Sequence, residues 1–242
     1  MRKILIITLD GLDAKLLFSD ERLENFHRLM EYGCYGRLEL DEYYDKSLSA
    51  IRPFWRQVVQ QGMRLILLDS QPEELPQELD LKAYQLNLER ASDRIEKGDW
   101  DCIIVSSEIL SCFQQDKKDT YPEYKTASDN YAELDSQIGK FLSIMGEVSN
   151  VLILSVRGTN TEQNGFFILA STVSPLGGEL GGVKAVDLIT TLLELGEYEV
   201  PAGIPGKSLV SGRKIQSVQE NELTNDEEAL LRERLSGLGY IS

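Results

Sequence analysis

The sequence predicts an α/β protein with a mostly parallel central sheet and helices on both of its faces. Four short apolar runs lack the alternation of a half-exposed strand, as expected for strands that are buried on both faces of a parallel sheet. Segments with helical spacing separate these runs, and this order is typical of strand–helix–strand units. The four runs lie within residues 3–11, 63–68, 101–105 and 151–154.

The first run, KILIITLDG, ends abruptly in a carboxylate and a glycine, Asp10 and Gly11. Functional groups of parallel sheets collect at the carboxyl ends of the strands, so Asp10 stands where a site is expected. Ser19 and Asp20 predict the N-cap of a following helix. That helix carries apolar and aromatic residues at helical spacing and ends at Gly33; they are Leu23, Phe26, His27 and Met30.

The middle of the chain alternates in the same way. Residues 36–40 predict a short strand, and the polar residues 41–50 predict a loop. Residues 52–61 predict a compact helix that stops at a glycine. The proline-rich, acidic residues 70–82 predict a surface excursion, and residues 84–97 predict a further amphipathic helix.

The longest helical pattern covers residues 122–145. Residues 166–169 predict a fifth strand, either antiparallel or at an edge of the sheet. The glycines of residues 177–182 predict a bend before a helix over 183–195. An acidic amphipathic helix is expected over 225–236 near the end of the chain.

The chain of 242 residues is long enough to bury a full core, and we expect one domain over residues 1–242. The loop and helix of residues 196–242 are expected to pack on that core. The chain carries a formal net charge of −15. This acidity argues against binding to nucleic acid or to an anionic membrane, because phosphate groups demand a basic surface.

The three cysteines, Cys34, Cys102 and Cys112, show no spacing typical of a metal site or a redox motif. Cys102 lies in an apolar run, so we expect a buried thiol, which fits a reducing compartment. The first apolar run is followed by Asp10 and Asp13 and is too short to direct export. The sequence therefore predicts a cytoplasmic protein without a membrane-spanning segment.

Three polar clusters follow the apolar strands, at residues 8–10, 106–111 and 155–157. A parallel sheet would bring these clusters together at one edge. Within them, Asp10 could be a metal ligand, or it could cap the turn that follows it. The residues alone leave both roles open.

His27 is the sole histidine, and it belongs to a helix rather than to a strand end. A site with several histidine ligands is therefore excluded, and a histidine-activated nucleophile has one candidate base. Ser47 and Ser49 are weak candidates for a nucleophile, since serines ahead of a helix are usually caps. The glycines of residues 177–182 match neither a phosphate-binding loop nor a dinucleotide fingerprint.

Six collinear pieces of the chain resemble the alkaline phosphatase superfamily, in particular its phosphodiesterase/nucleotide pyrophosphatase and predicted phosphohydrolase branch. The resemblance spans nearly the whole chain, although the cap insertion of that family has no counterpart. The pieces are KILIITLDGLDAKLL with LENFHRLMEYGCYGRLEL, FWRQVVQQGMRLILLDSQP, GDWDCIIVSSE, YAELDSQIGKFLSIM with NVLILSVRG, AVDLITTLLELGEYEVPAGIPGKSL, and EEALLRERLSGLGYIS.

The resemblance implies a two-metal site, in which Zn²⁺ or similar ions are held by aspartates and histidines and activate a serine or threonine. Asp10 matches the first of these aspartates, and Ser111 and Gln115 fall at or near the second Asp–His pair. In the strand end that reads SVRG, Val156 and Arg157 stand where the family has an aspartate and a histidine. The last histidine of the family has no counterpart. The loop before residue 50 could offer Ser47 or Ser49 in the slot of the nucleophile.

A single carboxylate cannot hold two divalent ions, and the permanent charge of Arg157 would repel a metal. Arg157 could instead pair with Asp10 across the strand ends, or it could bind a phosphate or carboxylate group. We therefore expect a catalytically inactive homologue without a cofactor, with Asp10 as a vestigial ligand. Such a protein would act by binding another protein or a second copy of itself, or by binding a small phosphate-containing ligand.

Two other functions stay open at this point. The chain could be a phosphoesterase with a rebuilt site, using Asp10 with Glu108 or Asp116 and one Mg²⁺, Mn²⁺ or Zn²⁺ ion. It could also be a sensor of a small anionic ligand at Arg157.

Overall fold

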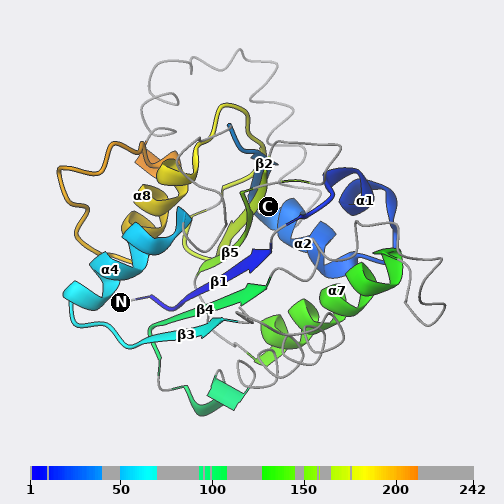
Figure 1. The fold of residues 1–242 in the computed structure, drawn as a ribbon, viewed down its shortest axis with the longest axis horizontal. Coiled ribbons are helices and arrows are strands. Elements are labelled where there is room, and N and C mark those ends of the chain that lie inside the picture. Colours follow the sequence, from blue (N-terminus) through cyan, green and yellow to red (C-terminus); the bar gives the residue numbers. More distant parts are fainter. Residues whose placement is uncertain are drawn as a thin grey trace, which may run out of the picture.

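The computed structural model describes most of the chain between residues 2 and 211. The described residues are 2–9, 11–39, 50–69, 93–94, 96–98, 100–107, 127–144, 150–156, 158, 165–174 and 176–211. They form one sheet with helices on both faces, so the predicted fold class is confirmed (Figure 1).

The described sheet has seven strands in the order β3-β4-β1-β5-β6-β2-β7. The pairs β3–β4, β4–β1, β1–β5 and β2–β7 are parallel, whereas β6 is antiparallel to both β5 and β2. The strands are β1 (Ile4–Leu9), β2 (Cys34–Arg37), β3 (Leu65–Asp69), β4 (Cys102–Ser107), β5 (Asn150–Ser155), β6 (Phe166–Ser171) and β7 (Gly178–Glu179).

The helices divide between the two faces of the sheet. They are α1 (Ala14–Ser19), α2 (Glu24–Tyr32), α4 (Arg52–Gln60), α7 (Ala127–Ile144) and α8 (Ala185–Leu195). The helices α1, α2 and α7 pack with alternate strand residues such as Leu5, Ile7 and Ile153. The helices α4 and α8 pack with the intervening residues, such as Ile6 and Leu152. Figure 1 shows these two layers on opposite sides of the sheet.

Strand β1 is central because it pairs with β4 on one side and β5 on the other. All six of its residues are buried. This burial on both faces explains why its sequence is continuously apolar up to Thr8, and the prediction from that pattern is confirmed.

The chain between β1 and α2 differs from the expectation. Residues 14–19 form α1, which the sequence pattern did not indicate. Asp20 ends α1 rather than starting α2, and the N-cap position of α2 is Leu23, whose side chain makes no capping hydrogen bond. The predicted N-cap at Ser19 and Asp20 is therefore wrong, because another part of the fold caps α2.

The strand expected over 36–40 begins earlier, at Cys34, because it pairs with β6 from Cys34 to Arg37. The glycine-rich bend of residues 177–182 contains β7, a two-residue strand next to β2. Strand β6 is antiparallel, which is one of the two arrangements expected for it. It lies inside the sheet rather than at an edge. The helix expected at 225–236, the loop of 41–49 and the excursion of 70–82 lie outside the described residues.

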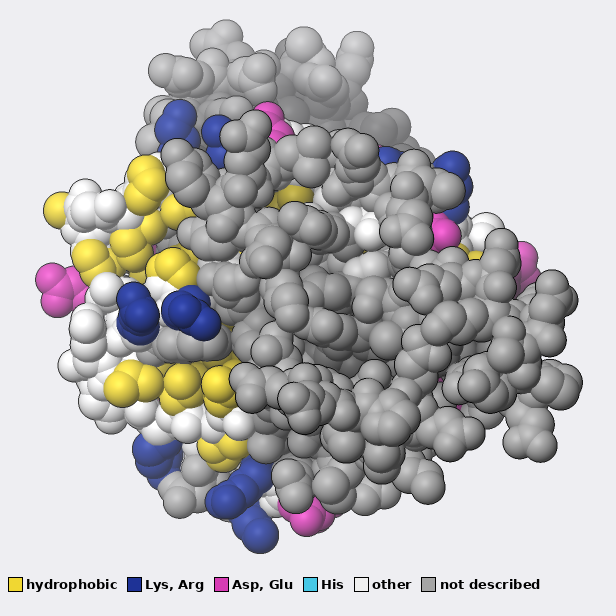
Figure 2. Space-filling model, viewed as in Figure 1, with side chains coloured by type: hydrophobic (Ala, Val, Ile, Leu, Met, Phe, Trp, Pro, Cys, Tyr) yellow, Lys and Arg dark blue, Asp and Glu magenta, His cyan; other side chains and the backbone are white. Residues whose placement is uncertain are grey.

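Cys34 and Cys102 are buried free thiols, as expected for Cys102, and burial raises the pKa of Cys102 above its ordinary value. The described helices include none with the length and apolarity needed to cross a bilayer. Figure 2 shows apolar side chains next to Lys and Arg on the side of the molecule that carries α4 and α8.

Candidate functional site

The carboxyl ends of β4, β1 and β5 meet at one edge of the sheet. Thr8 of β1 is in register with Ser106 of β4 and with Leu154 of β5. The strand ends that precede the three polar clusters are therefore adjacent, as the sequence predicted. We take this carboxyl edge as the candidate functional site.

Most side chains that the sequence singled out at this edge lie outside the described residues. This holds for the candidate binding, nucleophilic and alternative ligand residues Asp10, Arg157, Ser111, Gln115, Ser47, Ser49, Glu108 and Asp116. Their roles stay predictions. The geometry of the edge is given by its described residues.

The turn after β1 is fixed by three successive residues. Gly11 has a φ of 87°, a conformation that favours glycine. The backbone N–H of Leu12 donates to Ser155 Oγ at 3.3 Å, and that of Asp13 donates to Tyr131 Oη at 2.6 Å. Asp13 also caps α1, since its Oδ1 accepts from the backbone N–H groups of residues 15 and 16 at 2.9 and 3.3 Å.

Two buried hydroxyl groups lie side by side on the other face of the edge. Thr8 and Ser106 share the face of Ile6 and Ile104, which belong to the core under α4 and α8. Thr8 Oγ1 is buried without a hydrogen-bond partner among the described residues. Burying a hydroxyl group without a hydrogen-bond partner is unfavourable. Packing alone would therefore favour an apolar side chain here.

The end of β5 does not offer a metal ligand. Val156 is 7% exposed and packs in the same apolar core as Leu154. The chain also approaches itself closely here, because a Cβ on Gly165 would lie 2.2 Å from the Ser155 carbonyl oxygen and 2.3 Å from that of Val156. By the resemblance Val156 takes the place of a metal-binding aspartate, and an apolar side chain in a packed core cannot fill that role.

The single histidine of the chain contacts a neighbouring helix. His27 is on α2, and its Nε2 is 2.7 Å from the carbonyl oxygen of Leu17 in α1. In this structure it joins α1 and α2. Among the described residues, no group of three histidine, cysteine, aspartate or glutamate side chains is placed to hold a metal ion.

Three residues of this site carried little signal in the sequence. Tyr131 belonged to the apolar stripe of the long helix, but its hydroxyl reaches the turn after β1. Ser155 and Asp13 are small polar residues near strand and helix ends, where such residues are common. Their contacts cross 143 residues for Leu12–Ser155 and 118 for Asp13–Tyr131, so local patterns could not reveal them.

Neither a protein-family model nor a curated protein sequence matches the chain. Solved structures resemble it in fold. A 2-O GAG sulfatase has a TM-score of 0.66 at 11% identity, covering 87% of this chain and 74% of that one. A putative sulfatase from Bacteroides thetaiotaomicron has a TM-score of 0.65 at 12% identity, covering 87% and 74%. A protein in the alkaline phosphatase superfamily from Vibrio parahaemolyticus has a TM-score of 0.56 at 13% identity, covering 86% and 69%.

Proposed function

Because the chain has the fold of the alkaline phosphatase superfamily, we propose that it is a catalytically inactive homologue that acts by binding or assembly. The observation that carries this proposal is the apolar environment at the end of β5. There Val156 is buried in the apolar core and is followed in the sequence by Arg157. By the resemblance these two positions would provide an aspartate and a histidine to the metal ions.

The charge of the site supports the same proposal. Clamping a transferred phosphoryl or sulfuryl group with two divalent cations needs several anionic or imidazole ligands. The sequence supplies one histidine, and the structure uses it to join α1 to α2. Arg157 stays positively charged at any accessible pH and would repel a cation in that place.

A catalytically inactive homologue would function by binding a ligand or a partner. We propose that the carboxyl edge binds a protein partner, a second copy of the chain, or a small phosphate-containing ligand, with Asp10 and Arg157 as its charged groups. Ser111 and Gln115 are proposed to line the same edge. A cytoplasmic location is part of this proposal, since the acidic sequence has three cysteines without a disulfide-like spacing.

Elemental analysis of the purified protein, combined with assays on phosphate-ester and sulfate-ester probes, tests the proposal. We expect no stoichiometric metal and no turnover. Stoichiometric zinc or manganese, together with turnover that Asp10→Asn abolishes, would overturn it.

Thermal melts separate a rebuilt phosphoesterase from this proposal and test whether the edge binds an anion at Arg157. A rebuilt phosphoesterase site would raise the melting temperature with Mg²⁺, Mn²⁺ or Zn²⁺, and Asp10→Asn would remove that effect. An anion sensor would be stabilised by inorganic phosphate in the wild type and not in Arg157→Ala.

A further inference from the structure

The turn of residues 11–13 at the carboxyl edge is held from two distant elements. Its first residue, Gly11, has a backbone conformation that favours glycine. Leu12 is 2% exposed and packs in the core, and its N–H donates to Ser155 at the end of β5. Asp13 donates its N–H to Tyr131 of α7. The N–H groups of Leu12 and Asp13 are therefore each held by a hydroxyl group from a different element.

The two acceptors are themselves rigid. Ser155 is fully buried, and its position in β5 places its side chain on the face of Val151 and Ile153. The ring of Tyr131 is buried among apolar residues of the same core, so its hydroxyl reaches the turn from a fixed point. Burial raises the pKa of this phenol, so the hydroxyl stays neutral at ordinary pH.

We infer that Ser155 and Tyr131 are positioning residues: their hydroxyl groups hold the turn after β1 in a single conformation and so preorganise the carboxyl edge for its ligand. Ordering a free turn on binding costs conformational entropy for each of its residues. A turn that is ordered beforehand avoids this loss, so the ligand binds more tightly. This inference rests on the proposal that the carboxyl edge is the functional site.

A merely structural role predicts something different. Removal of a buried hydroxyl that accepts a backbone N–H weakens the whole fold wherever it lies. A positioning role predicts in addition that the losses of the two hydroxyl groups are coupled, because both hold the same turn, and that the loss of order is concentrated in that turn. Thr191 provides the matched control, since its buried Oγ1 accepts the Leu209 N–H at 2.9 Å on the opposite face of the sheet.

Double-mutant cycles on the full chain, measured by denaturant unfolding, test the inference. The single changes are Tyr131→Phe, Ser155→Ala and Thr191→Val. We expect the effect of Ser155→Ala on the unfolding constant to differ by about threefold or more between wild type and Tyr131→Phe. In the Thr191→Val background it should stay within about twofold of its wild-type value.

Amide hydrogen exchange gives a local reading of the same variants. Tyr131→Phe should speed exchange at Asp13, and Ser155→Ala at Leu12, by about fivefold to tenfold more than at amides in the centre of β1. An additive cycle for Tyr131→Phe and Ser155→Ala, or a uniform rise in exchange like that of Thr191→Val, would overturn the inference. Metal and turnover in the purified protein would overturn the proposed inactivity instead, so the two failures are distinguishable.

Discussion

The carboxylate of Asp135 on α7 accepts the backbone N–H of Phe26 at the start of α2, at 2.8 Å. The same carboxylate accepts the backbone N–H of Asn25 at 3.2 Å and its side-chain amide at 2.8 Å. Since Leu23 cannot cap α2 with its side chain, Asp135 provides the missing acceptor from another helix. This contact explains why an acidic residue is 3% exposed within the apolar stripe of α7.

Replacing Asp135 by alanine is expected to lower the free energy of unfolding by about 3 kcal/mol, because two helix-end N–H groups and a side-chain amide lose a charged acceptor. Denaturant unfolding measures this change. Asp129→Ala on the same helix is the control: Asp129 pairs with Arg22 at the surface and should cost about 1 kcal/mol or less. Equal effects of the two changes would contradict the capping role of Asp135.

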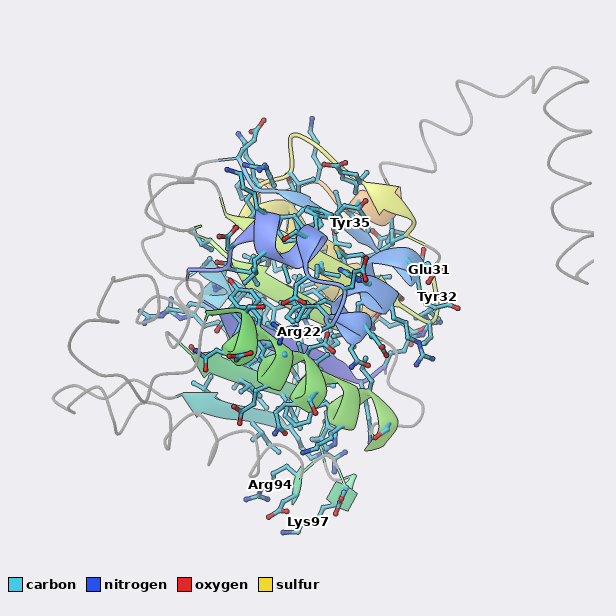
Figure 3. The ribbon with its side chains drawn as sticks, turned by 90° about the vertical axis from the view of Figure 1, so that its right-hand side faces the viewer. Arg22, Glu31, Tyr32, Tyr35, Arg94 and Lys97 are labelled. Atoms are coloured by element: carbon cyan, nitrogen blue, oxygen red, sulfur yellow. The ribbon has the colours of Figure 1, made fainter. Side chains whose placement is uncertain are left out.

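A second contact with α7 predicts that the free energy of unfolding depends on pH. Hydrogen bonds from Arg22 and then from Ser128 hold the pKa of Asp20 well below its ordinary value of 3.8. Figure 3 shows Arg22 between α7 and the chain that leads from α1 to α2. A carboxylate with a lowered pKa stabilises the fold above its ordinary pKa, and this contribution is lost as the pH falls below about 4.

Unfolding of the wild type and of Asp20→Asn at pH 7 and at pH 3 measures this contribution. The stability difference between the two proteins should be larger at pH 7 and should shrink at pH 3, where the Asp20 carboxyl is largely protonated in the unfolded chain but not in the folded protein. A difference that is constant over this range would show that Asp20 does not couple folding to protonation.

Gly165→Ala is expected to destabilise the protein by about 2–3 kcal/mol, because the new Cβ would meet two backbone carbonyl oxygens that cannot move aside easily. Gly203→Ala is the control, since a Cβ there meets no atom within 4 Å. Thermal unfolding compares the two variants. A neutral Gly165→Ala would mean that the ends of β5 and β6 are less tightly packed than the structure indicates.

Val156→Asp tests the proposed loss of a metal site directly. We expect a loss of about 3 kcal/mol or more in stability, because a carboxylate would enter the apolar core without a charged partner. Val156→Ala, which removes only apolar contact, should cost about 1–2 kcal/mol. If Val156→Asp were as stable as the wild type and bound zinc in stoichiometric amount, the proposed misfit of the site would be wrong.

Local patterns predicted the strands and most helices because burial selects apolar residues. A strand buried on both faces is continuously apolar, and a helix has apolar residues at helical spacing. The continuous apolar run of β1 and the stripe of α7 are examples, and both elements lie where the patterns indicated. Elements without such an apolar pattern were missed, or their predicted ends were shifted. Helix α1 has six residues and is held by Asp13, and β7 has two residues and depends on its pairing with β2.

By itself the sequence determined the fold class and the adjacency of the strand ends, and its single histidine excludes a site with several histidine ligands. Only the tertiary structure decided which groups, distant in the sequence, form hydrogen bonds with the turn after β1 and with the helices. Ser155 and Tyr131 meet the turn after β1, Asp135 caps α2, and His27 joins α1 to α2. The physical reason is that burial acts on each residue separately and shows in composition, whereas a hydrogen bond needs two groups that only the folded chain brings together.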